Sequence, residues 1–289
     1  MPSVTPLSPA IGSVVAGLNL AQDMSKGTMA RLIALLHERG VVVIKDQSLS
    51  DAQYAEFGHH WGRPLEFFLK EHRGSEFPII IRIANDPATP IAMRDGAVHW
   101  HSDSSYEEEP AAVTMLYGRE SPEVGGVTHF ASTVAAYDAL PEATKADIGS
   151  LVAVHELGGA PWVEGESEPD PDRPPHGLPR QHHPLVMRHP VTGKKAIFTS
   201  GTACGIDGIG DDEARDLIRR LREHIVRPEF RIDYKILPGD IVLWDNFSTV
   251  HCASPIEYSD EPGKRRLLFR ISTKGLPALC IAAREAAIR

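Results

Sequence analysis

Two stretches of the chain repeat their apolar residues with the period of an amphipathic helix. The first runs from about Lys26 to Arg39, with Gly40 after it as a stop signal, and the second from Asp211 to Val226. In each, apolar side chains recur at spacings of three and four residues: Met29, Leu32, Ile33 and Leu36 in the first, and Leu217, Ile218, Leu221 and Ile225 in the second. Further helices are predicted from Ser50, a suitable N-cap, to Trp61 and between Ala135 and Ser150.

Short apolar runs predict β-strands over much of the remaining chain. The β-branched run 41–44 is typical of a strand that is buried on both faces. Other runs predict a short strand and turn at 12–20 and strands at 78–83, 112–117, 127–130, 184–188, 195–198, 230–236, 240–244 and 267–273. Of these, 184–188 and 195–198 would pair around a turn at Thr192-Gly193. Many short strands with helices near both ends of the chain favour an α+β protein with a closed or sandwiched β core.

Residues 160–184 differ from the rest of the chain in composition. This stretch is rich in Pro, Glu and Asp and lacks apolar periodicity, so it is expected to form a long surface loop. Long loops in compact domains often serve as lids over a site. The alternative is a solvent-exposed loop that has no function. No internal repeat is present, and the length suits one large domain, so 1–289 is predicted to be a single domain.

Composition limits the classes of function. The chain has 289 residues and a formal net charge of −9 without a cationic stripe, so nucleic acid is not an expected partner. Three widely spaced cysteines fit neither a disulfide framework nor a zinc ribbon. Neither a leader nor an apolar run of roughly 20 residues is apparent, which predicts a cytoplasmic protein with no membrane partner. The sequence leaves a homo-oligomer open.

His101 and Asp103 form the sharpest local chemical feature. Residues two apart in an extended segment point to the same side, so these two could ligate one metal ion, with His251 as a distant third ligand. Two histidines and one carboxylate make the facial triad of non-haem iron(II) oxygenases, which leaves coordination positions for a 2-oxo acid and O2. A zinc hydrolase could use the same three residues. A non-catalytic β-sandwich binding module with structural histidines would need no metal.

Several ordered motifs resemble the taurine dioxygenase and 2,4-dichlorophenoxyacetate dioxygenase family. They are Trp100–Ser105, Gly125–Thr128, Pro238–Asp240 with Trp244–Asn246 and His251, and the pair Arg266 and Arg270, together with Ala136–Pro141 and His189–Lys195. The resemblance covers most of the chain. It implies a double-stranded β-helix (jelly-roll) core with flanking helices, Fe(2+) as cofactor, and 2-oxoglutarate and O2 as co-substrates.

The resemblance also implies residue roles. The iron ligands would be His101, Asp103 and His251, the 2-oxoglutarate carboxylate would be held by Thr128 and Arg266, and Arg270 would face the substrate. A guanidinium suits a carboxylate because its fork pairs with both oxygens. The interval from His251 to Arg266 is longer than is usual in the family, with 259–264 as extra loop. Arg265 would shorten this interval, but the strand phase relative to Arg270 favours Arg266.

The expected substrate is a small organic molecule, with a carboxylate or sulfonate as its anionic group. Residues 62–70 resemble the phenoxyacetate-oxidising branch, in which a lysine at the position of Lys70 meets the substrate carboxylate. Lys70 and Arg270 would then form a cationic end, with Phe67, Phe68 and Trp100 lining an apolar remainder. The enzyme would hydroxylate this substrate and release succinate and CO2. An amino-acid-derived intermediate of natural-product biosynthesis is the alternative.

Several of these side chains also have an ordinary structural interpretation. Lys70 would then be a surface lysine, Trp100 part of the core, and Arg270 the partner of an acid such as Glu107 or Glu108. The remaining polar candidates are expected to be structural or solvated: His99 a neighbour of the metal site, His129 structural or exposed, His182 and His183 solvated, Asp245 and Asn246 fixing the turn before His251, and Cys252 pointing away from it.

Overall fold

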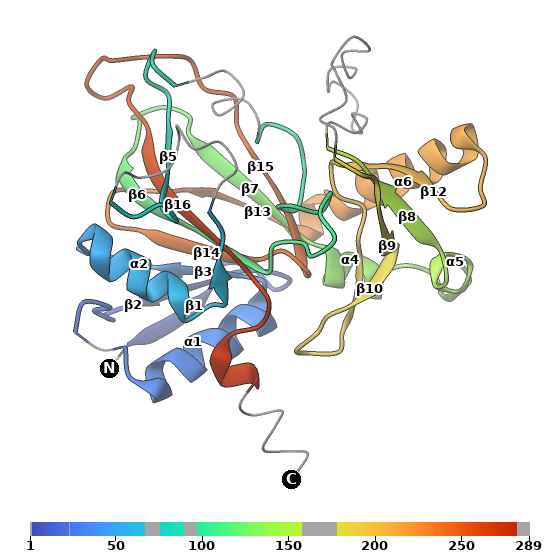
Figure 1. Ribbon diagram of the computed structural model, residues 1–289, viewed down its shortest axis with the longest axis horizontal. Helices are drawn as coiled ribbons and strands as arrows, with labels where there is room; N and C mark the ends of the chain where they lie inside the picture. The colour runs from blue at the N-terminus through green and yellow to red at the C-terminus, as the bar shows by residue number, and fades with distance from the viewer. Residues whose placement is uncertain (1, 23, 67–75, 90–96, 158–177, 282–289) are drawn as a thin grey trace.

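Eight strands form the large sheet of the protein, and a smaller sheet faces it (Figure 1). The computed structural model describes residues 2–22, 24–66, 76–89, 97–157 and 178–281. The large sheet has the order β1-β2-β3-β14-β6-β16-β4, and β5 also pairs with β16. Its strands are β1 Ser3–Pro6, β2 Ser13–Ala16, β3 Val41–Ile44, β4 Arg63–Pro64, β5 Ile81–Ala84, β6 Val113–Glu120, β14 Ile241–Asp245 and β16 Leu267–Lys274.

The smaller sheet has three antiparallel strands in the order β13-β7-β15. They are β13 Arg231–Lys235, β7 Val127–Ser132 and β15 Thr249–Ala253. Phe130 of β7 packs in one buried cluster with residues of the large sheet such as Leu116, Val242 and Leu268. The two sheets therefore enclose a common core, which is the sandwich that the sequence predicted.

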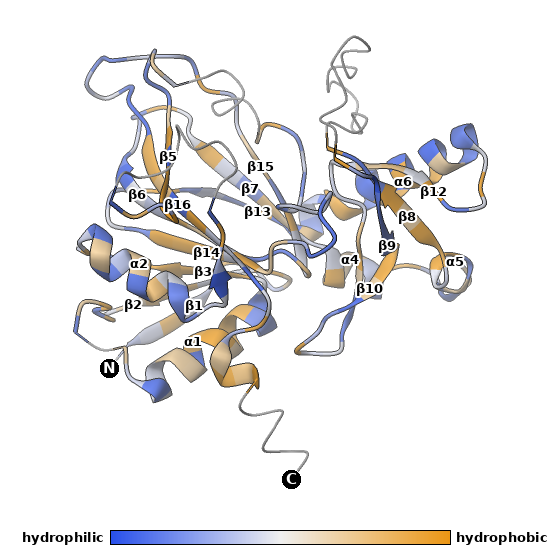
Figure 2. Cartoon of the chain, in the orientation of Figure 1, coloured by the Kyte–Doolittle hydropathy of each residue, from blue (hydrophilic) through white to orange (hydrophobic). Residues whose placement is uncertain are grey.

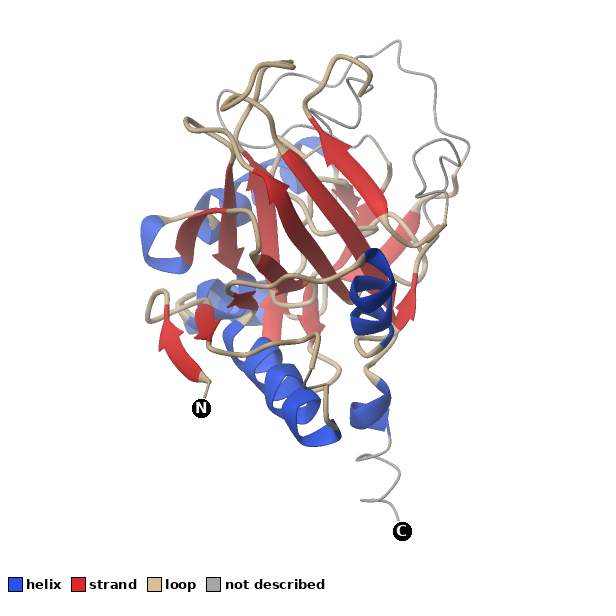
Figure 3. Ribbon diagram, turned by 90° about the vertical axis from the view of Figure 1, so that its left-hand side faces the viewer, coloured by secondary structure: helices blue, strands red, loops and turns tan. Residues whose placement is uncertain are grey.

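Alternating side chains give the large sheet two buried faces. Val41 and Val43 of β3 point into the space between the sheets, whereas Val42 and Ile44 pack on the outer side. Two helices cover that outer side: α1 Lys26–Arg39, capped by Ser25, and α2 Asp51–His59, with a capping box between Ser50 and Gln53. In Figure 3 the strands run through the middle of the molecule and the helices lie at its periphery.

Gly40 ends α1 with a φ of 72°, a left-handed conformation that suits glycine. An added Cβ here would lie 2.8 Å from the Cγ2 of Thr249, so the chain also needs glycine for close approach. Leu36, just before it, is fully buried against the sheet, and burial of such a side chain stabilises the fold by roughly 1.5–3 kcal/mol. The end of α1 thus packs directly on the segment that leads into β15.

A second lobe packs on the outer side of the small sheet (Figure 1). Its strands are β8 Val152–His155, β9 Gln181–Pro184, β12 Ala203–Ile206, and the hairpin of β10 Val186–Arg188 with β11 Lys195–Ile197. Its helices are α4 Thr133–Asp138, α5 Glu142–Ile148, α6 Asp211–Ile225 and the short 3-10 helix Pro228–Phe230. Figure 2 shows α6 with an apolar stripe and a hydrophilic outer face, as its sequence pattern predicted.

The helix over 26–39 and the hairpin of 184–188 with 195–198 are confirmed, with β10 beginning at Val186. The loop over 160–184 is wrong at its C-terminal end, because 181–184 form β9 and pair with β8. Residues 160–177 of that stretch lie outside the described residues. The single-domain assignment stays a prediction. In the part of the chain that the structure describes, no helix is both long and apolar enough to cross a membrane.

Candidate metal centre

His101 and His251 come together through a pair of backbone hydrogen bonds. The amide of His101 donates to the carbonyl of His251 at 2.9 Å, and the reverse bond measures 2.8 Å. Asp103 reaches the same place, with its carboxylate oxygens 3.9 Å from Nε2 of His101 and 3.8 Å from Nε2 of His251. One potential ligand atom from each residue lies within 4.8 Å of the others. The three side chains that the sequence singled out therefore share one site.

The two imidazoles present their Nε2 atoms toward Asp103. Nδ1 of His101 lies 2.7 Å from the carbonyl oxygen of His99, which fixes the proton on Nδ1 and leaves Nε2 free to bind a metal. The His251 ring is held by packing, stacked on Phe130 and 4.5 Å from the Trp244 ring between centroids. Burial foremost lowers the pKa of both histidines, so both are neutral near pH 7, as metal ligands must be.

Asp103 is buried, and both of its carboxylate oxygens accept hydrogen bonds. Thr114 and the indole N–H of Trp244 donate to its Oδ2 at 2.7 and 3.2 Å. Its backbone N–H donates to the side-chain oxygen of Asn246 at 3.0 Å. Burial alone would raise the pKa of Asp103, but the Arg270 guanidinium, the two neighbouring histidines and the Thr114 hydrogen bond together outweigh burial and hold that pKa well below its ordinary value. The carboxylate is therefore an oriented anion.

Arg270 has an internal partner, and it is neither of the glutamates suggested above. Its Nη2 donates to Oδ1 of Asp103 at 2.7 Å, and its Nε donates to Ser272 at 3.0 Å. Glu107 pairs instead with Lys274. The internal acid partner that the sequence left open is therefore Asp103, because strand β16 brings Arg270 beside the carboxylate of the triad.

Thr128 and Arg266 are two buried polar side chains with unused hydrogen-bonding capacity. The Thr128 hydroxyl is buried and has no hydrogen-bond partner in the described part of the chain. Arg266 is only 8% exposed, its guanidinium pairs with no carboxylate of the described residues, and burial lowers its pKa to about 10. Arg265, the rejected alternative, is exposed and pairs with Glu120 at the surface.

Asn85 fixes the backbone at Arg266. Its side-chain oxygen accepts from the Arg266 N–H at 2.7 Å, and its side-chain amide donates to the carbonyls of Glu257 and Lys264. The extra loop over 259–264 is therefore tied down at both ends, which accommodates its additional length. The sequence alone did not single out Asn85. The only hint was the position of this residue just after a predicted strand.

The comparisons with known proteins identify this constellation. The family model described as "Taurine catabolism dioxygenase TauD, TfdA family" matches residues 3–272. The chain belongs to this family. It is therefore a 2-oxoglutarate-dependent dioxygenase, an oxidoreductase that uses iron(II), 2-oxoglutarate and O2. Two imidazoles and one carboxylate, all oriented, are the donor set that iron(II) takes in such enzymes.

Relatives and solved structures agree with this assignment. The dioxygenase is 31% identical to an (S)-phenoxypropionate/alpha-ketoglutarate-dioxygenase of Sphingobium herbicidovorans, over 95% of this chain and 96% of the relative. It is 29% identical to an alpha-ketoglutarate-dependent 2,4-dichlorophenoxyacetate dioxygenase of Cupriavidus pinatubonensis, over 93% and 96%. A taurine dioxygenase structure from Burkholderia xenovorans superposes with a TM-score of 0.78 at 26% identity, over 95% and 91%. The jelly-roll core with flanking helices is thereby confirmed, and neither the binding module nor the zinc hydrolase is favoured.

Strand register places several other candidates of the dioxygenase on the far face of the small sheet. His251 lies opposite Phe130, which faces the core, so the next pair, Cys252 and His129, faces outward. Trp100 lies beside His129, with ring centroids 6.2 Å apart, and packs against the second lobe. The outward direction of Cys252 is confirmed, and the position of Trp100 argues against its predicted contact with substrate.

His183 is not solvated as expected: it is buried, and its Nε2 bonds to the Glu107 carbonyl at 3.0 Å, because β9 packs on the loop after Asp103. His182 is exposed, as expected. Lys70, Phe67 and Phe68 lie outside the described residues.

A second buried cluster of the dioxygenase contains His37, His189 and Asp245, whose potential ligand atoms also lie within 4.8 Å of one another. Nε2 of His189 is 2.5 Å from a carboxylate oxygen of Asp245. Sequence reasoning assigned Asp245 to the turn before His251, and its Oδ1 does accept from the Phe247 N–H there. It gave His189 no partner, because the two residues are 56 positions apart. The only available signal was that both lie in motifs of the family.

Proposed function

We propose that this dioxygenase holds iron(II) with His101, Asp103 and His251 and binds 2-oxoglutarate with Thr128 and Arg266. The proposal is carried by two buried side chains: in the described part of the chain the Thr128 hydroxyl has no hydrogen-bond partner and Arg266 has no carboxylate partner. Thr128 lies on the same face of β7 as Phe130, the residue opposite His251. A desolvated guanidinium without a carboxylate partner among the described residues is costly unless an anion binds to it. The distal carboxylate of 2-oxoglutarate supplies that anion and also accepts a hydrogen bond from the Thr128 hydroxyl.

The bound iron, with 2-oxoglutarate and O2, supplies the oxidising power of the reaction, which releases succinate and CO2. The protein's contribution is to orient and neutralise the metal-binding groups. Thr114, Trp244 and Arg270 donate hydrogen bonds to the Asp103 carboxylate and hold it beside the Nε2 atoms of His101 and His251. Such partners of a ligand typically tune metal affinity by 10–100-fold.

The proposed substrate is a small organic anion that carries a carboxylate or sulfonate. Relatives are named for phenoxypropionate and 2,4-dichlorophenoxyacetate, and another is a sulfate ester dioxygenase of Pseudomonas putida. Arg270 supports this choice because its Nε and Nη2 are engaged, while Nη1 has no partner in the described part of the chain. Nη1 would meet the substrate anion, with Lys70 as a second cation.

The decisive experiment measures succinate formation by the iron(II)-loaded enzyme with 2-oxoglutarate and a substrate panel. The panel contains aryloxyalkanoic acids, alkyl sulfonates, alkyl sulfates and the neutral amides of the acids. We expect at least one anionic class to stimulate succinate release well above the rate without substrate. Stimulation by the neutral amides alone would overturn the proposed substrate class. No succinate under any condition would overturn the assignment of the site.

We further propose that the enzyme works in the cytoplasm, as one domain, without a nucleic-acid partner. The acidic net charge of −9 supports the last point, because phosphate backbones bind cationic surfaces. A homo-oligomer is compatible with every contact described above.

A further inference from the structure

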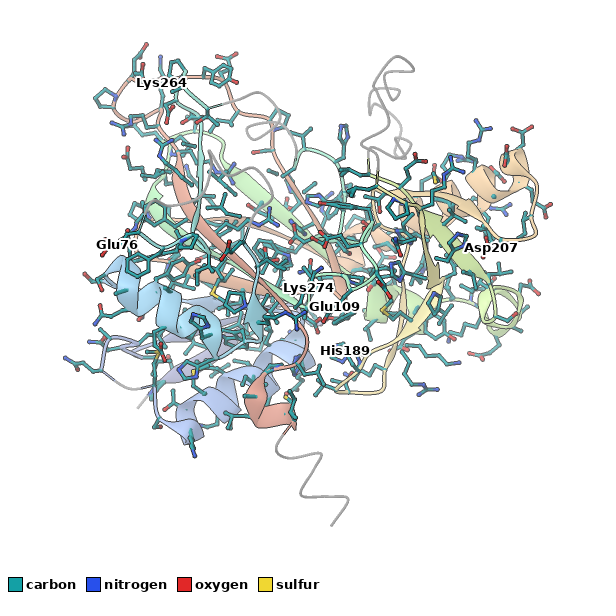
Figure 4. All side chains as sticks on the ribbon, in the orientation of Figure 1. Glu76, Glu109, His189, Asp207, Lys264 and Lys274 are labelled. Atoms are coloured by element: carbon teal, nitrogen blue, oxygen red, sulfur yellow. The ribbon has the colours of Figure 1, made fainter. Side chains whose placement is uncertain are left out.

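The contact between His189 and Asp245 is buried and joins two distant parts of the chain. Both side chains are 1% exposed, and Nε2 of His189 lies 2.5 Å from Oδ2 of Asp245. His189 follows β10 at the start of the hairpin turn, and Asp245 ends β14. His37 at the end of α1 contacts the His189 ring edge-on, with centroids 5.2 Å apart. Figure 4 labels His189 where the hairpin approaches α1.

The hydrogen bonds of His189 determine where its proton lies. Nδ1 accepts from the backbone N–H groups of Val191 and Thr192 at 3.0 and 3.1 Å, so it carries no proton. The proton is therefore on Nε2 and is donated to Asp245. A metal ion bound at Nε2 would have to displace this proton, so the cluster is a hydrogen-bonded pair rather than a second metal site. The buried hydrogen bond from His189 to Asp245 is called the strut below.

Asp245 lies between two residues that hold the metal-binding carboxylate. Trp244 and Asn246 both bond to Asp103, whereas Asp245 points the opposite way, toward His189. Its Oδ1 accepts from the Phe247 N–H at 2.9 Å, and its carbonyl accepts from the Thr249 hydroxyl at 2.8 Å. These bonds fix the turn that carries the chain into β15 and to His251.

The position of His251 depends on that turn more than is usual for a metal ligand. A ligating histidine normally donates its second ring N–H to a carbonyl or carboxylate. Nδ1 of His251 is buried without such a partner in the described residues. Among the described residues, the ring is oriented mainly by its backbone and by packing on Phe130 and Trp244, so a displaced turn would displace the ligand.

We propose that His189 is a positioning residue of the metal centre. By anchoring Asp245 from the far side, it fixes the 244–246 segment that orients Asp103 and the turn that delivers His251. The inference rests on the proposed function, because it takes His101, Asp103 and His251 as the metal ligands. It predicts that loss of the strut weakens metal binding by the unloaded protein.

Two substitutions separate the strut from the hairpin turn. His189→Asn retains an oxygen that can accept the turn's backbone N–H groups, as in an Asx-turn, but is too short to reach Asp245. His189→Gln retains a donor at about the reach of Nε2 but lacks the acceptor at the Nδ1 position. Asp245→Asn removes the anion while keeping an oxygen for Phe247. His182→Asn is the matched control, since His182 and Asp207 form an exposed pair at 2.9 Å.

The measurement is anaerobic titration of metal-free protein with cobalt(II), followed by its visible absorption, with thermal unfolding of the metal-free form alongside. We expect the cobalt Kd to rise about tenfold in His189→Asn and in Asp245→Asn. It should stay within about twofold of wild type in His189→Gln and His182→Asn. If His189→Asn fails to fold, Asp245→Asn carries the comparison.

Three outcomes overturn the positioning role. One is an unchanged cobalt Kd in both strut variants, even with a lower unfolding temperature, which would leave a purely structural contact. Another is a weakened His189→Gln beside a normal His189→Asn, which would assign the effect to the hairpin. The third is two cobalt ions per wild-type chain, which would make the cluster a metal site. Failure of wild type to bind cobalt would instead overturn the proposed function.

Discussion

Arg270 donates to Oδ1 of Asp103 at 2.7 Å, so one guanidinium neutralises the carboxylate between the two histidines of the triad. Arg270 side-chain exposure is 24%, against 4% for Asp103, which places the arginine at the open edge of the site. The same residue can therefore serve the proposed metal ligand on one side and an anionic substrate on the other. The sequence predicted that Arg270 faces the substrate, and the structure adds its contact with Asp103.

Removal of Arg270 should abolish the difference in kcat/KM between charged and neutral substrates. In wild type, conversion of an acid substrate to its neutral amide should lower kcat/KM on the order of 100-fold, since a charge-assisted pair contributes about 3 kcal/mol. In Arg270→Leu the acid and amide should differ by less than about threefold. Steady-state succinate assays with both substrates provide the check. Equal rates for acid and amide in wild type would exclude a cationic substrate contact.

Loss of a triad histidine should abolish iron binding without unfolding the protein. His251→Ala removes one of three ligands while the backbone bonds between positions 101 and 251 remain. We expect iron(II) stoichiometry and turnover near zero, with far-UV circular dichroism like that of wild type. His129→Ala, on the outer face of the same sheet, is the control and should bind iron normally. Normal iron content in His251→Ala would refute the assignment of the triad.

Arg266→Gln should affect 2-oxoglutarate and leave the metal in place. It replaces a buried guanidinium by a neutral amide, so the KM for 2-oxoglutarate should rise on the order of 100-fold, about 3 kcal/mol, with iron stoichiometry unchanged. Arg265→Gln, at the surface, should change it less than twofold. An effect confined to the primary substrate would show that another residue holds the co-substrate.

His155 should make the fold sensitive to acid. Burial, with a smaller contribution from His183, lowers the pKa of His155 to about 3, and its side chain is fully buried. In the unfolded chain His155 takes up a proton as the pH falls through 6.5, whereas in the folded chain it stays neutral until about pH 3. The stability that comes from burying the neutral imidazole is therefore fully present above pH 6.5 and is lost as the pH falls toward 3.

The variant His155→Leu tests this dependence. Between pH 6 and 5 the free energy of unfolding in wild type should fall by up to about 1.4 kcal/mol per pH unit from this residue alone. His155→Leu should lack that component of the slope in urea titrations at each pH. The exposed His182→Leu serves as the comparison and should keep the wild-type slope. Parallel slopes in wild type and His155→Leu would contradict the prediction.

The sequence by itself determined the local elements and the chemistry. The period of Met29, Leu32 and Leu36 specified α1 because a helix places such residues on one face. The alternation within short apolar runs specified strands in the same way. The spacing of His101 and Asp103 and the order of the family motifs indicated iron and 2-oxoglutarate, because few other chemistries need this set of side chains.

Only the tertiary structure decided how distant residues pair. Antiparallel register put Trp100 on the outer face with His129 and brought Arg270 to Asp103 rather than to a glutamate. It also joined His189 to Asp245 across 56 positions. A strand's sequence shows which residues share a face, but neither the neighbouring strand nor the register. Those depend on the packing of the whole core, and a shift of one residue would send every side chain to the opposite face.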